Sequence, residues 1–242
     1  MDRIEVQSLR PKLITFDCAN TLIWTDWKPH TFAIRCAQKA GIELSDDAAE
    51  LYMRLFVPKL PEFWRVNQTR SFENWRLFWV RQVEDWLSVM GLPTDNALEL
   101  HLLAEKEIFE VPSSTFRRFD DVIPCLENLK QKGYTLAVLS NWDHSLHRCI
   151  EAHGLTPYFD KVFASLEEGI EKPDAGFFNI ALSYFNVGPT EVFHIGDDVL
   201  DDLQGAQNLG IPAALIDRSL SMPMRPVISN LSQLEEAFTW FG

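Results

Sequence analysis

Residues 13–22 have the sequence LITFDCANTL, in which a short apolar run ends at a carboxylate and is followed by turn-forming residues. This order is typical of a buried strand that delivers one polar group to the carboxyl edge of a parallel sheet. Asp17 is the group delivered here, and we take it as the candidate reactive residue. An Asp that merely caps a helix fits this stretch equally well, so the rest of the chain has to decide between the two interpretations.

The composition indicates a globular protein that does not bind nucleic acid. Of its 242 residues, 46% are hydrophobic and 24% are charged, which suits one large or two modest domains. The formal net charge is −13, and phosphate backbones are bound by clustered Lys and Arg, of which the chain has no dense run. No apolar run approaches the roughly 20 residues that span a bilayer, and the amino terminus lacks the apolar core of a signal peptide. We therefore expect a cytoplasmic protein without a membrane partner.

The cysteines are widely spaced and form no CxxC pair or zinc-like pattern. We expect free thiols in a reducing compartment. They are Cys18, Cys36, Cys125 and Cys149.

Residues 25–111 have the apolar periodicity of helices, and no strand is expected there. Ser71 starts a pattern in which apolar side chains recur at three- and four-residue steps until Gly91. Another helical pattern begins near Thr94 and ends before Pro112. Most of the tryptophans of the chain fall in this region, and aromatic residues on amphipathic helices more often form core than a ligand-facing wall.

From residue 112 onward, apolar strand-like runs alternate with helical patterns. The expected strands cover residues 134–139, 161–164, 191–195 and 213–216. Together with residues 13–16 they predict an α/β protein with an open, doubly wound, parallel, five-stranded, Rossmann-like sheet. The expected domains are an α/β core of residues 1–24 and 112–242 and an inserted all-helical domain of residues 25–111. We expect the first and fourth core strands to be neighbours, with Asp17, Ser140 and Asp197 at one edge of the sheet.

Four carboxylates crowd into six residues directly after the strand at 191–195. Like charges four residues apart repel on a helix, although a solvated helix start tolerates acids. A hard divalent cation would offset the repulsion, and Mg²⁺ prefers oxygen ligands such as those of Asp17 and Asp197. The four are Asp197, Asp198, Asp201 and Asp202.

Lys172, just before an expected helix start, would neutralise charge near these acids and a phosphoryl group. Ser140 and Asn141 offer hydroxyl, amide and backbone donors to phosphoryl oxygens.

Four short motifs, each at a predicted strand end or helix start, resemble those of the haloacid dehalogenase (HAD) superfamily. The resemblance covers nearly the whole chain. It rests on the presence of all four motifs in the same order, since any one of them alone is a weak signal. The helical insertion then resembles the type-one cap of that superfamily. The motifs are Asp17-x-x-x-Thr21, Ser140-Asn141, Lys172-Pro173 and Gly196-Asp197-Asp198-x-x-x-Asp202.

This resemblance implies that Asp17 is the nucleophile and forms an aspartyl-phosphate intermediate, with Lys172 as the second catalytic residue. It implies Mg²⁺ bound by Asp17, the backbone carbonyl of Ala19, and Asp197, with Asp202 the most important of the surrounding acids. It also implies that a small phosphorylated molecule is held by Thr21, Ser140, Asn141 and Lys172. The oligomeric state is expected to be a monomer or a homodimer.

Ala19 departs from the pattern. Phosphatases of the superfamily usually have an Asp at this position, which protonates the leaving group and later activates water. Losing a general acid/base typically costs about 10²–10⁴-fold in rate. We therefore expect a Mg²⁺-dependent hydrolase of a small phosphorylated metabolite that is slow, or limited to good leaving groups such as acyl phosphates.

Two alternatives stay open. Phosphonoacetaldehyde hydrolases of this superfamily also have Ala at that position and form a Schiff base on a cap lysine, for which Lys39 and Lys59 are the candidates. A catalytically weak binding protein would keep the same site without turnover. 2-Haloacid dehalogenases lack the second Asp as well, but they work without metal, and the acidic fourth motif argues against that chemistry here.

Overall fold

The computed structural model describes residues 10–113, 115–221 and 224–241. The chain divides into two compact units. An α/β unit comprises Met1–Trp24, Arg118–Trp142 and Gly154–Gly242, and a helical unit comprises Thr25–Arg117 and Asp143–His153. The helical unit was expected to be residues 25–111 alone. Its action as a cap stays a prediction.

The α/β unit contains a parallel sheet, as predicted, but six strands form it in the described residues where five were expected. The order is β5-β4-β1-β6-β7-β8. The additional strand, β8, has only two residues, which is too short to give a periodic signal in the sequence. The strands are β1 (Leu13–Phe16), β4 (Thr135–Ser140), β5 (Lys161–Ala164), β6 (Val192–Gly196), β7 (Ala213–Ile216) and β8 (Val227–Ile228).

Strand β1 lies between β4 and β6, so the predicted neighbour relation of the first and fourth core strands is confirmed. Phe16 pairs with Val138 on one side and with Ile195 on the other. The carboxyl ends of these three strands therefore lie side by side. This register brings Asp17 next to the segments that begin at Ser140 and Gly196.

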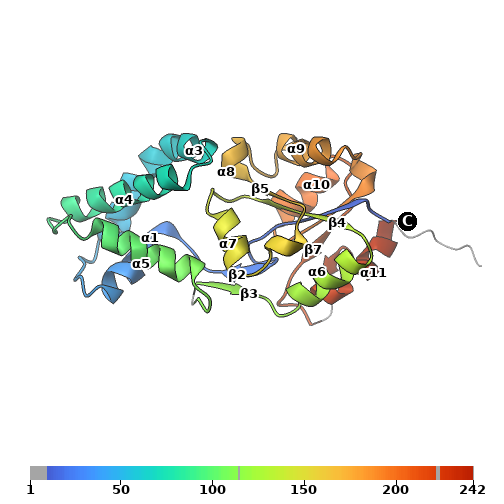
Figure 1. Ribbon diagram of the computed structural model, residues 1–242, viewed down its shortest axis with the longest axis horizontal. Coiled ribbons are helices and arrows are strands. Elements are labelled where there is room, and N and C mark those ends of the chain that lie inside the picture. Colours follow the sequence, from blue (N-terminus) through green and yellow to red (C-terminus); the bar gives the residue numbers. More distant parts are fainter. Residues whose placement is uncertain (1–9, 114, 222–223, 242) are drawn as a thin grey trace, which may run out of the picture. The chain divides into compact units, whose positions relative to one another are not determined.

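Helices cover both faces of the sheet (Figure 1). On one face, Phe177 and Phe178 of α9 pack among buried residues that include Leu13 and Leu139. On the other face, the Phe193 ring lies 4.8 Å from that of Phe238 on α11. The helices of this unit are α6 (Val122–Gln131), α8 (Ser165–Glu168), α9 (Ala175–Phe185), α10 (Gly205–Gln207) and α11 (Leu234–Phe238), with the π-helix Val199–Gln204 after β6.

The helical unit has an aromatic core, and the interpretation of its tryptophans as core is confirmed for Trp75, Trp79 and Trp86, which are buried. Phe56 stacks on Trp79 with 5.3 Å between ring centroids. Ser71 caps α4 by accepting a hydrogen bond from the N–H of Asn74, as its position predicted. The helices are α1 (Pro29–Lys39), α2 (Ala48–Phe56), α3 (Leu60–Gln68), α4 (Phe72–Val89), α5 (Ala97–Phe109) and α7 (Leu146–Ala152).

Helix α7 was expected in the α/β part because it directly follows β4. Its segment belongs instead to the helical unit, where Nε1 of Trp75 donates to Oδ2 of Asp143 at 2.8 Å. The backbone N–H of His144 donates to Oδ1 of Asn67 at 2.7 Å. The guanidinium of Arg148 lies 4.2 Å from the centre of the Phe72 ring. These polar and cation–π contacts explain why this helix groups with a distant part of the sequence.

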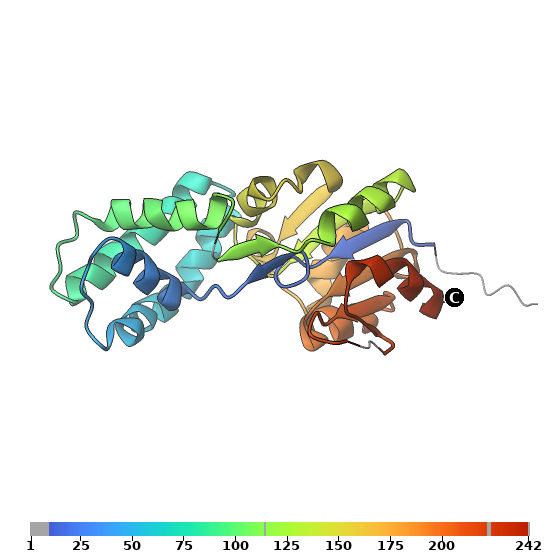
Figure 2. The same ribbon diagram turned by 90° about the horizontal axis from the view of Figure 1, so that it is seen from below.

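A two-stranded sheet forms where the chain passes between the units (Figure 2). It pairs β2 (Ile23–Thr25) with β3 (Phe116–Arg118), and neither strand was expected, because three residues give no clear alternation. The four cysteines are free, as predicted, and all four are buried. Within the described residues, no helix is both long and apolar enough to cross a membrane.

Candidate active site

Asp17 directly follows β1, at the point where the strand ends and the chain turns. Its backbone N–H donates to the carbonyl of Ile195 on β6 at 2.9 Å, which holds it beside the neighbouring strand. Asn20 then adopts a φ of 52°, a left-handed conformation that Asn tolerates better than most residues. Asp17 is 4% exposed, so the sequence-predicted carboxylate lies buried at a strand end.

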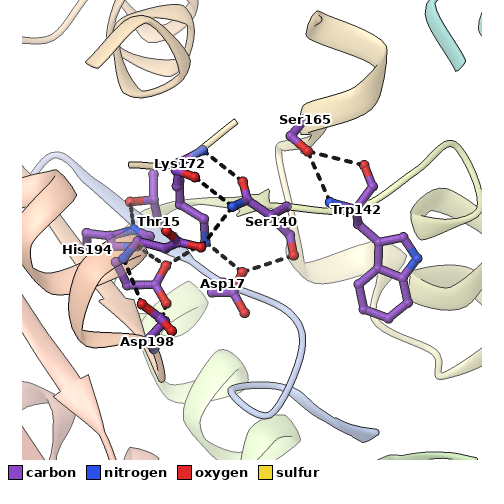
Figure 3. A network of polar contacts seen from close by, with 11 residues as sticks. Thr15, Asp17, Ser140, Trp142, Ser165, Lys172, His194 and Asp198 are labelled. Atoms are coloured by element: carbon purple, nitrogen blue, oxygen red, sulfur yellow. Dashed lines mark hydrogen bonds and ion pairs between the residues drawn. The ribbon is translucent and has the colours of Figure 1, made fainter. Parts of the chain in front are cut away.

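Lys172 brings a buried cation to this carboxylate (Figure 3). Its Nζ lies 2.7 Å from Oδ1 of Asp17 and 2.5 Å from Oδ1 of Asp202. Burial alone would lower the pKa of the ammonium, but the two carboxylates outweigh burial and raise it. Burial raises the pKa of Asp17, and the Lys172 charge opposes that effect. The three groups therefore form one tightly coupled unit with the lysine charged at neutral pH.

Ser140 and Asn141 come from the end of β4 and hold the other two groups in place. The Ser140 hydroxyl donates to Oδ1 of Asp17 at 2.9 Å. The Asn141 side chain accepts from the backbone N–H of Lys172 and donates to its carbonyl, both at 2.8 Å. It also donates to Oδ2 of Asp201 at 3.1 Å. Both side chains were expected to bind phosphoryl oxygens, and that role stays a prediction.

Asp202 is held by three donors from three parts of the chain. Oδ1 accepts from Lys172 and, at 3.0 Å, from Nε2 of His194, while Oδ2 accepts from the backbone N–H of Asp198 at 3.0 Å. Burial alone would raise the pKa of Asp202, but Lys172 and His194 outweigh burial and lower it. Asp202 is thus an ionised carboxylate whose hydrogen-bonding capacity is largely used.

Gly196 permits this close packing at the end of β6. A Cβ placed on it would lie 2.0 Å from Cγ of Asp202, which is far inside van der Waals contact. A glycine is therefore needed at position 196 because any side chain there would collide with Asp202, and not because of its backbone conformation.

Asp197 completes a cluster that suits a divalent cation. One carboxylate oxygen each from Asp17, Asp197 and Asp202 lies within 4.8 Å of the others. Burial, followed by the charges of Asp17 and Asp202, raises the pKa of Asp197 to about 7. Clustered carboxylate oxygens are the donors that Mg²⁺ prefers, so the residues present fit such an ion. Because Asp202 already accepts three hydrogen bonds, Asp17 and Asp197 are the better placed ligands.

Two other predicted residues lie in the turn after β1. The carbonyl oxygen of Ala19 accepts from the N–H of Thr21 at 2.6 Å. Thr21 is fully buried, its hydroxyl has no hydrogen-bond partner in the described part of the chain, and its carbonyl accepts from Arg218 at 2.6 Å. The metal-binding role of the Ala19 carbonyl and the substrate-binding role of Thr21 stay predictions.

His194 and Thr15 also belong to this network, and neither was expected to contribute to the site. They occupy paired positions on β6 and β1, and Nδ1 of His194 lies 2.8 Å from the Thr15 hydroxyl. The signal was present in the sequence, because each is a polar residue inside an otherwise apolar run that precedes an aspartate.

A buried carboxylate, a fixed lysine and an acidic cluster thus lie together at the carboxyl edge of a doubly wound sheet. A family model of haloacid dehalogenase-like hydrolases matches residues 11–210. The chain therefore belongs to this hydrolase family, and the resemblance drawn from the four motifs is confirmed.

Relatives of this chain include hydrolases of more than one description. It is 27% identical over 235 residues to haloacid dehalogenase-like hydrolase domain-containing protein 3 of Mus musculus, covering 93% of each chain. It is 31% identical over 142 residues to a glyceraldehyde 3-phosphate phosphatase of Methanothermobacter thermautotrophicus, covering 52% of this chain and 61% of the relative. A crystal structure of a 2-haloacid dehalogenase from Pseudomonas syringae matches with a TM-score of 0.67 and 27% identity, covering 96% of this chain and all of the other.

We predict that Gly196→Ala destabilises the protein by about 1–3 kcal/mol, the usual cost of overpacking a filled site. The added methyl would have to displace the Asp202 carboxylate. Urea unfolding followed by circular dichroism measures the change. Gly188→Ala is the matched control, because a Cβ there would meet only Oε2 of Glu191 at 3.7 Å. Equal stability of the two variants would contradict the close approach of Asp202.

Proposed function

We propose that this protein is a Mg²⁺-dependent phosphohydrolase that transfers a phosphoryl group from a small metabolite to Asp17 and then to water. The observation that carries the proposal is the asymmetric environment of the Asp17 carboxylate. Oδ1 accepts hydrogen bonds from Lys172 and Ser140, whereas Oδ2 has no hydrogen-bond partner among the described residues. One oxygen is thus anchored, and the other is available as a nucleophile.

In the proposed first step, Oδ2 of Asp17 forms a bond to phosphorus while the bond from phosphorus to the leaving oxygen breaks. Lys172 and Ser140 keep the carboxylate oriented, which reduces the entropic cost of reaching the reactive geometry. Water then attacks phosphorus in the second step, which releases inorganic phosphate and restores the carboxylate. Asp17 and Asp197 would hold the Mg²⁺, which would supply charge neutralisation at the phosphoryl oxygens.

Departure of the leaving group is not assisted by a proton donor at position 19, because Ala19 has only a methyl side chain. An alkoxide leaves poorly without a proton, whereas the carboxylate released from an acyl phosphate needs none. Acyl phosphates are therefore the substrate class that the proposal favours. The phosphatase name of the archaeal relative supports phosphoryl chemistry in this family.

A second candidate function is dehalogenation, which the similarity to the 2-haloacid dehalogenase structure favours. Asp17 and Lys172 would suit displacement of a halide from carbon as well as attack on phosphorus. The acidic cluster with Asp197 supports the phosphoryl alternative, because halide displacement needs no cation.

The phosphonate-cleaving alternative finds less support in the helical unit. Lys39 lies 2.5 Å from Oε1 of Glu107, and Lys59 lies 2.5 Å from Oδ2 of Asp85. A lysine that forms a Schiff base has to act as a neutral amine, and both of these amines are in ion pairs.

We predict that the protein releases phosphate from acetyl phosphate in the presence of Mg²⁺ and that Asp17→Asn abolishes the release, because an amide is no nucleophile. Molybdate detection of phosphate, alongside chloride detection with 2-chloropropionate, measures both candidate reactions. Asp95→Asn, an exposed change in the helical unit, is the control and should keep full activity. Metal-independent chloride release would replace the phosphatase proposal with the dehalogenase one.

We predict that Ala19→Asp raises kcat for an alkyl phosphate ester such as glycerol phosphate by about 10²–10⁴-fold, the usual contribution of a general acid/base. Ala19 is partly exposed, so a carboxylate at this position is not forced into the core. Ala19→Asn has nearly the same size and cannot act as an acid, so it should give no gain. A gain in both variants would show that the effect is not proton transfer.

We predict that about 10 mM Mg²⁺ raises the midpoint of thermal unfolding by about 2–8 °C, because only the folded chain assembles the acidic cluster. Differential scanning calorimetry measures the shift without any substrate. Asp197→Asn should remove the shift, and Asp95→Asn should keep it. A shift that survives Asp197→Asn would place the cation elsewhere.

A further inference from the structure

His194 is a fully buried polar residue in the middle of β6, between the apolar residues Phe193 and Ile195 in the sequence. Both of its ring nitrogens have partners. Nδ1 lies 2.8 Å from the Thr15 hydroxyl on β1, and Nε2 lies 3.0 Å from Oδ1 of Asp202. An ionised carboxylate can only accept hydrogen bonds, so Nε2 carries a hydrogen and donates it to Asp202.

The imidazole is held in this orientation from a second direction. The ring of Phe178 on α9 meets it edge to face, with 5.3 Å between centroids and an interplanar angle of 87°. The contacts with Thr15 on β1 and with Phe178 on α9 thus hold the ring in an orientation in which Nε2 points at Asp202.

Oδ1 of Asp202 is shared, because it accepts from His194 and from Lys172. Lys172 in turn contacts Oδ1 of Asp17 at 2.7 Å. A carboxylate that loses one of its donors can rotate about its terminal torsion, which has a broad energy minimum. The position of the Lys172 ammonium against Asp17 therefore depends on the His194 N–H that donates to Asp202.

We propose that His194 is a positioning residue: its Nε2–H fixes the Asp202 carboxylate so that Lys172 is held against Asp17. His194 does not contact Asp17 and acts only through Asp202 and Lys172. The activity arm of its test rests on the proposed phosphohydrolase function, whereas the structural arm is independent of that function.

The test compares His194→Leu, which removes the donor, with His194→Gln, whose amide N–H can replace Nε2–H. Phe193→Leu is the matched control, since its side chain lies on the opposite face of the same strand and packs on Phe238. Each variant is assayed with acetyl phosphate and Mg²⁺, and its midpoint of thermal unfolding is measured. The amide resonance of Asp198 is recorded by ¹⁵N NMR, because this N–H donates to Oδ2 of Asp202 and reports on the carboxylate orientation.

We expect kcat to fall about 10–100-fold in His194→Leu, the range typical for removing a hydrogen-bond partner that orients a residue of a metal site. KM should change less than kcat, because the fully buried His194 ring has no access to the substrate. His194→Gln should restore most of kcat, and the Asp198 resonance should move in the Leu variant alone. Phe193→Leu should lower the unfolding midpoint without changing kcat or that resonance.

Unchanged kcat and an unchanged Asp198 resonance in His194→Leu would overturn the proposal. It would also be overturned if the Gln and Leu variants lost the same activity, because a role in packing alone predicts that result. If the wild-type protein released no phosphate while the resonance moved only in the Leu variant, the positioning role would stand and the proposed function would fall.

Discussion

The ammonium of Lys172, held between two buried carboxylates, is the interaction on which the rest of the site depends. A buried charge without a partner costs several kcal/mol, and removing one partner of a buried pair typically costs about 3–5 kcal/mol. Asp17, Asp202 and Lys172 therefore stabilise one another, and none of the three would be tolerated alone at this depth. With Asp197 included, three carboxylates and one ammonium leave a formal charge of −2, which a single divalent cation would neutralise.

The fold assembles these charges through the position of β1 in the sheet. Because β1 pairs with β4 and β6, the segments that follow three neighbouring strands meet at one edge. Each segment then takes a conformation that aims one group inward. After β1, the chain turns at Asn20. After β4, Asn141 binds the backbone of Lys172 through two hydrogen bonds. At the end of β6, Gly196 leaves room for the Asp202 carboxylate.

The fold class and the membership of the site could be predicted because both depend on local patterns. Apolar runs that end in polar groups identify strands, and parallel order then places Asp17, Ser140 and Asp197 at one edge. The two-residue strand β8 left no such pattern. The grouping of α7 could not be predicted from its neighbours in the sequence, because the residues just before it contact Trp75 and Asn67, which lie 68 and 77 residues away. A sequence motif also identifies a residue without predicting the hydrogen-bond partners of its side chain. The Asn141 amide, expected to face a phosphate, is occupied by the backbone of Lys172.

The membership of α7 in the helical unit changes how separable that unit is. A domain inserted at one place in a chain is connected by two linkers and can be exchanged as a cassette. Here the segment Asp143–His153 makes two further crossings, and it begins two residues after Asn141. A transplanted helical unit that lacked this segment would lose the partners of Trp75 and Asn67, and the recipient would keep an α7 without its contacts. An exchange of the helical unit would therefore have to include the segment Asp143–His153 as well as Thr25–Arg117.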